Sequence, residues 1–355
     1  MFNNIYQGRN VVLTGHTGFK GSWMAAWLNK LGANVYGYSL DIPTQPSHIE
    51  LLNVSLSADE RGDICNSTEL HKFFDLAKPD IVFHFAAQSL VLPSYENPVE
   101  TFSTNVQGTV NVLEEARLSQ HTKAIVVATS DKCYENIESD KSYNEEDKLG
   151  GHDPYSASKG CAEIVVSSYQ RSFHRKGLLY ASVRAGNVIG GGDWAAGRLV
   201  PDIARAYYNN LNLNIRHPNA VRPWQHVLEP LSGYLLLGQK LLEGDGDFVG
   251  AWNFGPLDGE VQTVREIANL MSEIWDFSCS YDADLDHHHE AGLLVLDCSK
   301  ARKKLNWRPI WSIEDTANKT AEWYSNYYQY QQVSTDNQFD EYIGDAKSNK
   351  AVWID

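Results

Sequence analysis

The sequence predicts an α/β fold in which a doubly wound parallel sheet is followed by a smaller C-terminal domain. Apolar runs rich in β-branched residues alternate with amphipathic helical stretches through the first half of the 355-residue chain, as in successive βαβ units. A glycine-rich turn joins the first of these runs to the first helix. The regular alternation ends near residue 190. We therefore expect one domain over residues 1–190, a second over most of 191–330, and a polar tail over 331–355.

Each predicted strand of the first domain ends in a small or polar residue. The strands cover residues 10–15, 34–40, 80–87, 124–130 and 179–190. Helices are expected from the glycine turn to Leu31 and from about Tyr155. Open α/β sheets bind ligands at the carboxyl ends of their strands, so the ligand crevice is expected there. The tail from Gln331 lacks periodicity, which is compatible with a partly unfolded segment or one draped over a neighbour.

Composition and charge argue against several classes of protein. A hydrophobic fraction of 43% is enough to fill a core. The net charge of −15 disfavours a nucleic-acid or anionic-membrane partner, because binding phosphates needs clustered Lys and Arg. No window approaches the roughly 20 apolar residues of a membrane span, and no signal peptide is evident, so we expect a cytoplasmic protein. Five widely spaced cysteines without a CxxC pair indicate core residues rather than disulfides or a zinc site.

The turn TGHTGFKG places Gly15, Gly18 and Gly21 at intervals of three residues. In such a turn one glycine makes the bend, another lets the backbone approach a pyrophosphate, and a third lets the helix pack on the strand. The helix N-terminus then offers free N–H groups to the phosphates. Because the motif lies in the first βα unit, it predicts a Rossmann-type dinucleotide site rather than an ordinary turn.

The charges near the second predicted strand indicate which dinucleotide binds. NADP requires a cation for its 2′-phosphate, whereas a carboxylate that accepts from the ribose hydroxyls favours NAD. No Lys or Arg occurs between Leu31 and Glu60, and Asp41 follows the strand. We therefore expect NAD, although Asp41 would lie slightly beyond the ribose if the strand ends at Ser39.

Tyr155 and Lys159, in DPYSASKG, lie four residues apart at a predicted helix start and so share one face. An ammonium beside a phenol is expected to lower the pKa of the phenol and make it a usable base. Such a tyrosine can take a proton from a substrate hydroxyl while NAD takes the hydride from the same carbon. The pair alone would be common on any helix, but here it accompanies the glycine turn and a strand that ends in Ser130.

Together, the segments TGHTGFKG, HFAAQS, TSDKCY and YSASK resemble the extended short-chain dehydrogenase/reductase family, over nearly the whole chain to about residue 325. The resemblance implies that Ser130 hydrogen-bonds the reacting sugar hydroxyl and that Tyr155 and Lys159 act as described above. It also implies a nucleotide-sugar substrate and a homodimer or tetramer formed through helices that include the one carrying Tyr155.

Asp131 and Lys132 indicate which reaction of that family to expect. A 4-epimerase needs only the Ser, Tyr and Lys, whereas a 4,6-dehydratase also needs a base for the C5 proton and an acid for the departing C6 hydroxyl. Within the family, this Asp-Lys pair resembles the dehydratases that act on CDP-D-glucose. The resemblance implies that Asp131 is the acid and Lys132 the base, with burial and the nearby Lys159 making a basic lysine possible.

The resemblance also assigns the remaining site residues. The expected NAD-binding residues are Gly15, Thr17, Gly18, Phe19, Lys20, Gly21, Asp41, Asp63, Ile64, Ala86, Ala87, Gln88, Asn105, Tyr155 and Lys159. Asn105 is expected to order the strand ends behind the site. The expected substrate-binding residues are Ser89, Asn187, Arg198, Leu199, Val200 and Arg222, with the two arginines near the diphosphate.

Some features carry other interpretations. His287, His288 and His289 are adjacent and cannot readily converge on one ion, so no metal site is expected. Trp224, Trp252 and Trp307 are expected in packing, although one of them could stack on a base. Two alternative functions stay open at this point. One is a dehydratase or 4-epimerase acting on another nucleotide sugar, since nothing in the sequence reads cytosine directly. The other is a non-catalytic NAD-binding sensor, which would have no need of a proton relay.

Overall fold

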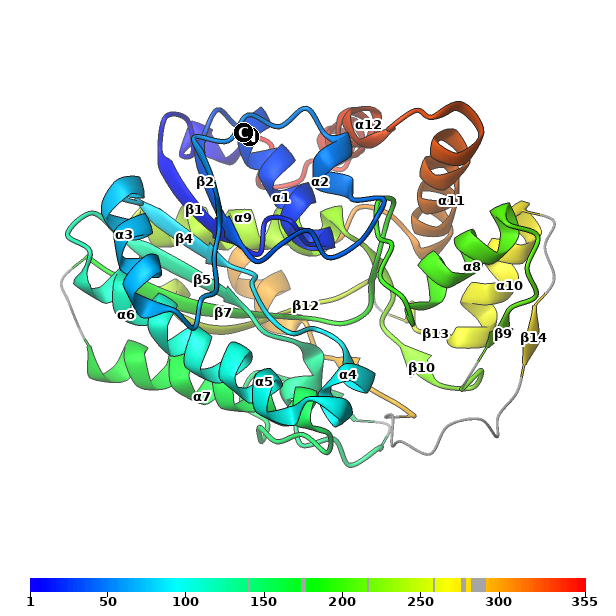
Figure 1. The fold of residues 1–355 in the computed structure, drawn as a ribbon, viewed down its shortest axis with the longest axis horizontal. Helices are drawn as coiled ribbons and strands as arrows, with labels where there is room; N and C mark the ends of the chain where they lie inside the picture. The colour runs from blue at the N-terminus through cyan, green and yellow to red at the C-terminus, as the bar shows by residue number, and fades with distance from the viewer. Residues whose placement is uncertain (140, 174–176, 216, 258, 276–278, 282–291) are drawn as a thin grey trace.

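A seven-stranded sheet, parallel throughout, forms the centre of the molecule, with strand order β12-β7-β5-β4-β1-β2-β3 (Figure 1). The computed structural model describes residues 1–355 except 140, 174–176, 216, 258, 276–278 and 282–291. The sheet strands are β1 (Asn10–Thr14), β2 (Asn34–Ser39), β3 (Ala58–Arg61), β4 (Ile81–His84), β5 (Ala124–Ala128), β7 (Leu179–Ala185) and β12 (Gly250–Phe254). The predicted doubly wound α/β fold is confirmed.

Helices cover both faces of this sheet, which explains why its central strands are almost continuously apolar. Val11 and Leu13 of β1 pack into one core and Val12 into the other. The first core includes residues of α1 (Phe19–Lys30), α9 (Leu228–Leu242), α11 (Ile313–Tyr330) and α12 (Thr335–Ser348). The second includes residues of α3 (Ser67–Ala77), α6 (Thr109–Leu118) and α7 (Pro154–Ser172).

A smaller group of elements lies beyond the carboxyl edge of the sheet, on the right in Figure 1. It contains α8 (Leu199–Tyr208), α10 (Val264–Trp275), β9 (Asn214–Ile215), β10 (Val221–Arg222), β13 (Gln262–Thr263) and β14 (Ser280–Tyr281). β9 pairs with β14 and β10 with β13. Between these segments the chain returns to the large sheet, because α9 packs on β5 and β12 pairs with β7.

Short elements complete the chain. They are α2 (His48–Leu51), α4 (Val91–Glu96), α5 (Pro98–Phe102), β6 (Ser142–Tyr143), β8 (Val188–Ile189), β11 (Gln225–His226), β15 (Val295–Leu296), the 3-10 turns η1 (Phe2–Asn4), η3 (Asp131–Cys133) and η4 (Gly246–Phe248), and the π-helical segments η2 (Ser103–Gly108) and η5 (Ala301–Leu305). The five strands predicted from the sequence are all present, whereas β3 and β12 were not predicted. β3 has mostly exposed polar residues, so it shows no apolar run.

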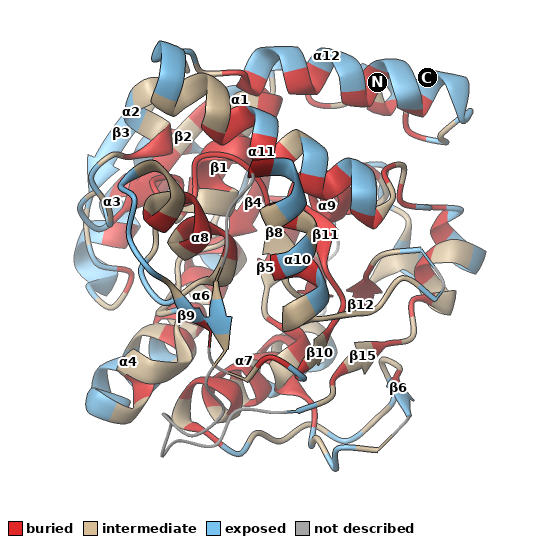
Figure 2. Cartoon of the chain, turned by 90° about the vertical axis from the view of Figure 1, so that its right-hand side faces the viewer, coloured by how far each residue is buried: buried red, intermediate tan, exposed pale blue. Residues whose placement is uncertain are grey.

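Of the two alternatives for the tail, a partly unfolded segment or one draped over a neighbour, the structure shows neither, because the segment forms α12 and packs on this chain's own core. Figure 2 shows α12 with one buried and one exposed face. Phe339 packs edge-on against Trp27, with ring centroids 5.6 Å apart. Trp353 stacks on Phe2 at 5.3 Å, and its carbonyl accepts from the Phe2 N–H at 2.7 Å. The tail is therefore tied to the N-terminus.

Candidate active site

The glycine turn has the tight geometry that the sequence predicted. Gly15 has a φ of 75°, and a Cβ there would lie 2.6 Å from the backbone nitrogen of Ala86. A Cβ at Gly21 would lie 2.0 Å from the Gly15 carbonyl oxygen, so α1 can pack this closely only on a glycine. α1 begins after Gly18, a residue with no side chain to cap it. The positive end of the helix thus faces the neighbouring cavity and can receive an anion.

One cavity of about 950 Å³ runs along the carboxyl edge of the sheet and contains almost every predicted site residue. Its wall includes all five expected catalytic residues, Ser130, Asp131, Lys132, Tyr155 and Lys159. It also includes Gly15, Thr17, Gly18, Phe19, Lys20, Gly21, Asp41, Asp63, Ile64, Ala86, Ala87 and Gln88 from the expected cofactor set, and Ser89, Asn187, Arg198, Leu199, Val200 and Arg222 from the expected substrate set. Residues from distant parts of the chain therefore line one cavity, which is large enough for a dinucleotide and a second ligand.

Asn105 differs from the rest of the expected cofactor set, because it is buried behind the cavity wall. Its side chain accepts from the Gln88 N–H at 2.9 Å and donates to the Gln88 carbonyl at 2.9 Å and to Ser158 Oγ at 2.8 Å. These bonds agree with its expected role in ordering the strand ends, and its assignment to the cofactor set stays a prediction.

The 3-10 turn η3 follows β5 directly and carries the acid and base candidates. Ser130 Oγ donates to Asp131 Oδ1 at 2.9 Å, and the Lys132 N–H donates to Ser130 Oγ at 3.1 Å. The Ser130 hydroxyl also favours the ionised form of Tyr155 and so opposes the effect of burial on its pKa. Asp131 is buried, and its Oδ2 has no hydrogen-bond partner among the residues that the structure describes. An unpaired carboxylate oxygen in a cavity wall is positioned to meet a polar group of a ligand.

Tyr155 and Lys159 project from the first turns of α7, which starts cleanly because Asp153 accepts from the Ser156 N–H at 2.9 Å and Pro154 occupies the first turn. Burial raises the pKa of Tyr155 to about 12. Burial, with the charge of Lys20 nearby, lowers the pKa of Lys159 to about 8, and its Nζ donates to the Ala128 carbonyl at 3.2 Å. The expected lowering of the tyrosine pKa is wrong for the chain alone, because desolvation of the phenolate outweighs the favourable charges.

Two further cations face the same residues. Burial, together with the charge of Arg198, lowers the pKa of Lys20 to about 8, and the charge of Asp131 opposes this shift. The Arg198 guanidinium donates to Asp193 Oδ2 at 2.9 Å and to Ser89 Oγ at 3.2 Å. Arg198 therefore links the start of α8 to the loop after β4, and its charge favours the ionised form of Tyr155.

Asp41 is exposed and lines the cavity after β2, and Asp63 and Ile64 line the same cavity. Arg61, at the end of β3, is held in place by its neighbours, because its guanidinium bonds to Asp59 and lies 3.0 Å from His16 Nε2. The nearby cation is thus already neutralised by a carboxylate, which agrees with the preference for NAD over NADP that the sequence predicted.

Part of the cavity wall is formed by residues that the sequence does not predict as site residues. They are Leu213, Asn214, Ile215 and His217, from the smaller group of elements. They lie on or beside β9, a two-residue strand without a detectable periodic signal. Arg222, nearby, is buried and donates to the Val221 carbonyl at 2.9 Å. Trp224 lines the cavity, whereas Trp252 and Trp307 are wholly buried in the core, as expected for packing residues.

Other features predicted from the sequence lie outside this cavity. His287, His288 and His289 fall outside the described residues. Within the described ranges, no group of three His, Cys, Asp or Glu side chains could hold a metal ion. None of the helices in those ranges has the length and apolar character needed to cross a bilayer. All five cysteines are free thiols, with Cys133 and Cys298 buried.

Comparison with known proteins decides the family. Residues 12–320 match the family model described as GDP-mannose 4,6 dehydratase. The chain belongs to this dehydratase family. It is 49% identical over 329 residues to the CDP-glucose 4,6-dehydratase of Salmonella typhimurium strain LT2, covering 90% of this chain and 92% of that protein. The expected membership of the extended short-chain dehydrogenase/reductases is confirmed.

More distant proteins share the fold of this dehydratase family. The CDP-paratose 2-epimerase of Salmonella typhi is 25% identical over 342 residues, covering 89% of this chain and 99% of that protein. The UDP-glucose 4-epimerase of Thermotoga maritima, solved with UDP-glucose, superposes with a TM-score of 0.78 at 25% identity, over 89% of this chain and 99% of that one. DesIV, a dTDP-glucose 4,6-dehydratase of Streptomyces venezuelae solved with NAD and TYD bound, gives 0.77 at 24% identity, over 90% and 97%.

Proposed function

We propose that the chain is an NAD-dependent 4,6-dehydratase that converts CDP-D-glucose to CDP-4-keto-6-deoxy-D-glucose. The observation that carries this proposal is the turn after β5, where Asp131 presents an unpaired oxygen to the cavity beside Lys132 and Ser130. The choice of CDP-D-glucose rests on the Salmonella typhimurium relative, which has that name and is 49% identical.

The cofactor end of the cavity fits NAD. The close packing at Gly15 and Gly21 and the uncapped start of α1 provide the tight, positive turn that a pyrophosphate requires. Asp41 and Asp63 lie further along the same wall, where the adenosine half would extend. When bound, NAD would supply the hydride acceptor.

The first chemical step uses Tyr155 and Ser130. Tyr155 takes the proton of the C4 hydroxyl as the hydrogen on C4 leaves as a hydride. Ser130 hydrogen-bonds the C4 oxygen. Since the pKa of Tyr155 is about 12 in the chain alone, the cations around it have to offset the cost of a buried phenolate. Lys159 and Arg198 provide positive charge within the same wall.

The second step uses Asp131 and Lys132. The new C4 ketone acidifies the C5 proton, which passes to Lys132, while Asp131 donates a proton to the C6 oxygen as the C6–O bond breaks and water leaves. Return of the C4 hydride to C6 would require a proton at C5, and Lys132 gives back the proton that it took from that carbon. The net change is the loss of one water, with no net oxidation or reduction. A 4-epimerase would have no use for this acid and base pair, which makes epimerisation the weaker candidate.

The direct test is an assay of the purified protein with the glucose adducts of CDP, dTDP, UDP and GDP, without added reductant. The alkali-induced absorbance of a 4-keto-6-deoxy sugar reports dehydration. Turnover with CDP-D-glucose alone supports both the reaction and the base preference. A keto sugar from another adduct would correct the base, and none from any adduct would refute the dehydratase.

The proposal includes a cytoplasmic homodimer. Exposed apolar side chains occur on two adjacent helices. Val99 and Phe102 of α5 are 79% and 38% exposed, and Ile164 of α7 is 58% exposed. The two helices pack side by side along one flank of the sheet (Figure 1). A second copy of the same surface is a suitable partner, because two-fold related helices can bury such residues against one another.

A further inference from the structure

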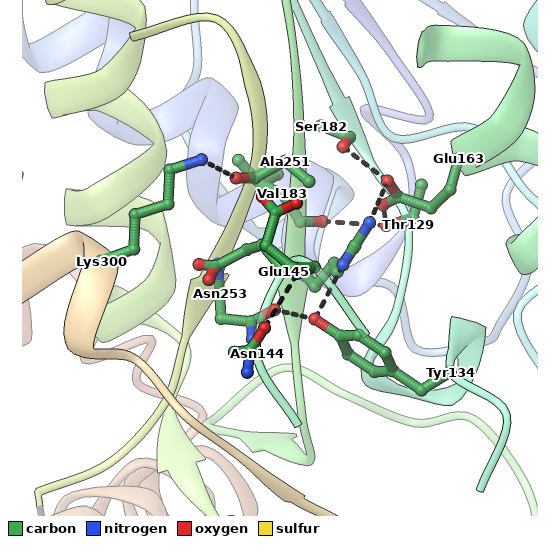
Figure 3. A network of polar contacts seen from close by, with 12 residues as sticks. Thr129, Tyr134, Asn144, Glu145, Glu163, Ser182, Val183, Ala251, Asn253 and Lys300 are labelled. Carbon is green, nitrogen blue, oxygen red and sulfur yellow. Dashed lines mark hydrogen bonds and ion pairs between the residues drawn. The ribbon is translucent and has the colours of Figure 1, made fainter. Parts of the chain in front are cut away.

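A buried ion pair joins Arg184 and Glu163, whose other partners include Thr129 and Tyr134, the residues on either side of the candidate catalytic turn. Figure 3 shows Glu163 beside Thr129 and Ser182, and Tyr134 beside Asn253. The Arg184 guanidinium of β7 donates to Glu163 Oε2 of α7 at 2.7 Å, and the two side chains are only 3% and 2% exposed. Removing two charges from water is costly, so such a pair persists only where further hydrogen bonds satisfy its remaining atoms. The partners of this pair therefore show which segments it fixes.

Glu163 joins α7 to two strands of the sheet. Its Oε1 accepts from Thr129 Oγ1 at the end of β5, and its Oε2 also accepts from Ser182 Oγ of β7 at 2.7 Å. Tyr155, Lys159 and Glu163 are spaced four residues apart on α7, so they share one face of the helix. The carboxylate thus anchors the helix that carries the tyrosine and lysine to the segment between β5 and Ser130.

Arg184 reaches the opposite end of the turn. Its second terminal nitrogen donates to the Tyr134 hydroxyl at 2.7 Å, and its guanidinium carbon lies 4.8 Å from the centre of the Tyr134 ring. The Tyr134 hydroxyl in turn donates to Asn253 Oδ1 of β12 at 2.8 Å. Asn253 Nδ2 bonds to the carbonyl oxygens of Tyr143 at 2.8 Å and Asp297 at 3.1 Å. The chain leaving the turn is therefore fixed as firmly as the strand entering it.

Thr129 and Tyr134 bracket residues 130–133, so one ion pair binds both ends of the catalytic turn. We propose that Glu163 and Arg184 are positioning residues. They fix the position of the turn that carries Ser130, Asp131 and Lys132 relative to Tyr155 and Lys159 on α7. This inference rests on the proposed function for its kinetic consequence. The carboxylate of Glu163 also raises the pKa of Lys159 against the effect of burial, so the pair supports that ammonium as well.

Tyr134→Phe is the most direct test, because the ring stays buried and only the hydroxyl that joins Arg184 to Asn253 is lost. Tyr6→Phe is the matched control, since Tyr6 is also buried and its hydroxyl donates to the Leu235 carbonyl, on α9. We expect Tyr134→Phe to lower kcat by about 10- to 100-fold with KM within about twofold, because small misplacements of catalytic groups cost rate rather than binding. We also expect faster amide hydrogen exchange in a peptide spanning residues 129–135, whereas Tyr6→Phe leaves both readouts unchanged.

Thr129 provides a second test from the other end of the turn. Thr129→Val removes the hydroxyl that donates to Glu163, and Thr129→Ser keeps it. We expect the valine variant to lose kcat and protection in the same peptide and the serine variant to restore both. Thr320→Val, at a buried threonine on α11, controls for the general cost of the substitution.

Two results would overturn the positioning role. One is Tyr134→Phe with wild-type exchange and wild-type kcat, and the other is loss of activity in both Thr129 variants alike. The exchange measurement needs no substrate. A wild-type chain that dehydrates none of the four nucleotide sugars would therefore refute the proposed function without changing the answer about the turn.

Discussion

At the scale of single residues, the site combines groups whose environments differ sharply although they share one wall. Tyr155 and Lys159 lie one helical turn apart, yet burial raises the pKa of the phenol to about 12 and lowers that of the ammonium to about 8. Both shifts disfavour the charged forms. Asp131 is different, because one oxygen is bonded to Ser130 and the other is unpaired. In the proposed mechanism, this unpaired oxygen is what distinguishes an elimination site from a site for oxidation alone.

Variants of the acid and base candidates test this distinction. We expect Asp131→Asn and Lys132→Met each to lower kcat with CDP-D-glucose by about 10²- to 10⁴-fold, the usual contribution of a positioned acid or base. KM should change little, because neither change removes a charge that the proposal assigns to binding. Steady-state kinetics provide the measurement.

The matched control is Lys72→Met, at an exposed lysine on α3 that does not line the cavity. It should retain wild-type kinetics. Wild-type turnover in both Asp131→Asn and Lys132→Met would contradict the assignment of the elimination step to this turn.

At the scale of elements, the turn between β1 and α1 sets the cofactor end of the cavity. The close contact at Gly21 lets the first turn of α1 sit directly on the Gly15 backbone. The two-residue strands β9 and β10 shape the opposite end, together with the arginine at the start of α8. The candidate catalytic turn η3 begins three residues after β5 ends at Ala128, and its residues line the same cavity.

Gly21→Ala tests the role of the turn. A Cβ placed 2.0 Å from a carbonyl oxygen forces the helix or the loop to move, so we expect the Kd for NAD to rise at least about tenfold, or ~1.4 kcal/mol. Titration calorimetry with NAD measures this change. Gly344→Ala, in α12 where a Cβ meets no atom within 4 Å, should bind NAD as wild type does. Equal affinities in both variants would contradict the assignment.

At the scale of the whole molecule, the proposed interface is formed by the exposed apolar residues of α5 and α7. The second of these helices also carries Tyr155 and Lys159. Ile164→Glu places a charge in the centre of the proposed interface, and we expect it to convert a dimer into a monomer. Sedimentation velocity measures the change. Ile274→Glu, at a partly exposed isoleucine on α10, should leave the dimer intact. A monomeric wild-type chain would refute this interface.

How far the sequence predicts the molecule depends on whether a feature is local. The glycine turn and the Tyr155 and Lys159 pair were predictable because their spacing fixes their geometry. The short strand β9 carries no periodic signal, so the sequence does not predict the cavity-wall residues on or beside it, Leu213, Asn214, Ile215 and His217. The bonds that tie Tyr134 to Arg184 and Asn253 join three distant segments, which only the folded chain brings together. Trp353 likewise belongs to a segment that the sequence predicts as a polar tail, because its stacking on Phe2 depends on contact between the two ends of the chain.

The measurement that tests the central claim most directly is the fate of a deuterium placed at C4 of CDP-D-glucose. If the sugar is oxidised at C4, dehydrated across C5 and C6, and reduced at C6 in one cavity, NMR of the product will show the deuterium at C6 of a 4-keto-6-deoxy sugar. Deuterium that stays at C4 of an intact hexose would mean either no reaction or an epimerase, and deuterium lost to solvent would contradict the return of the same hydride to C6.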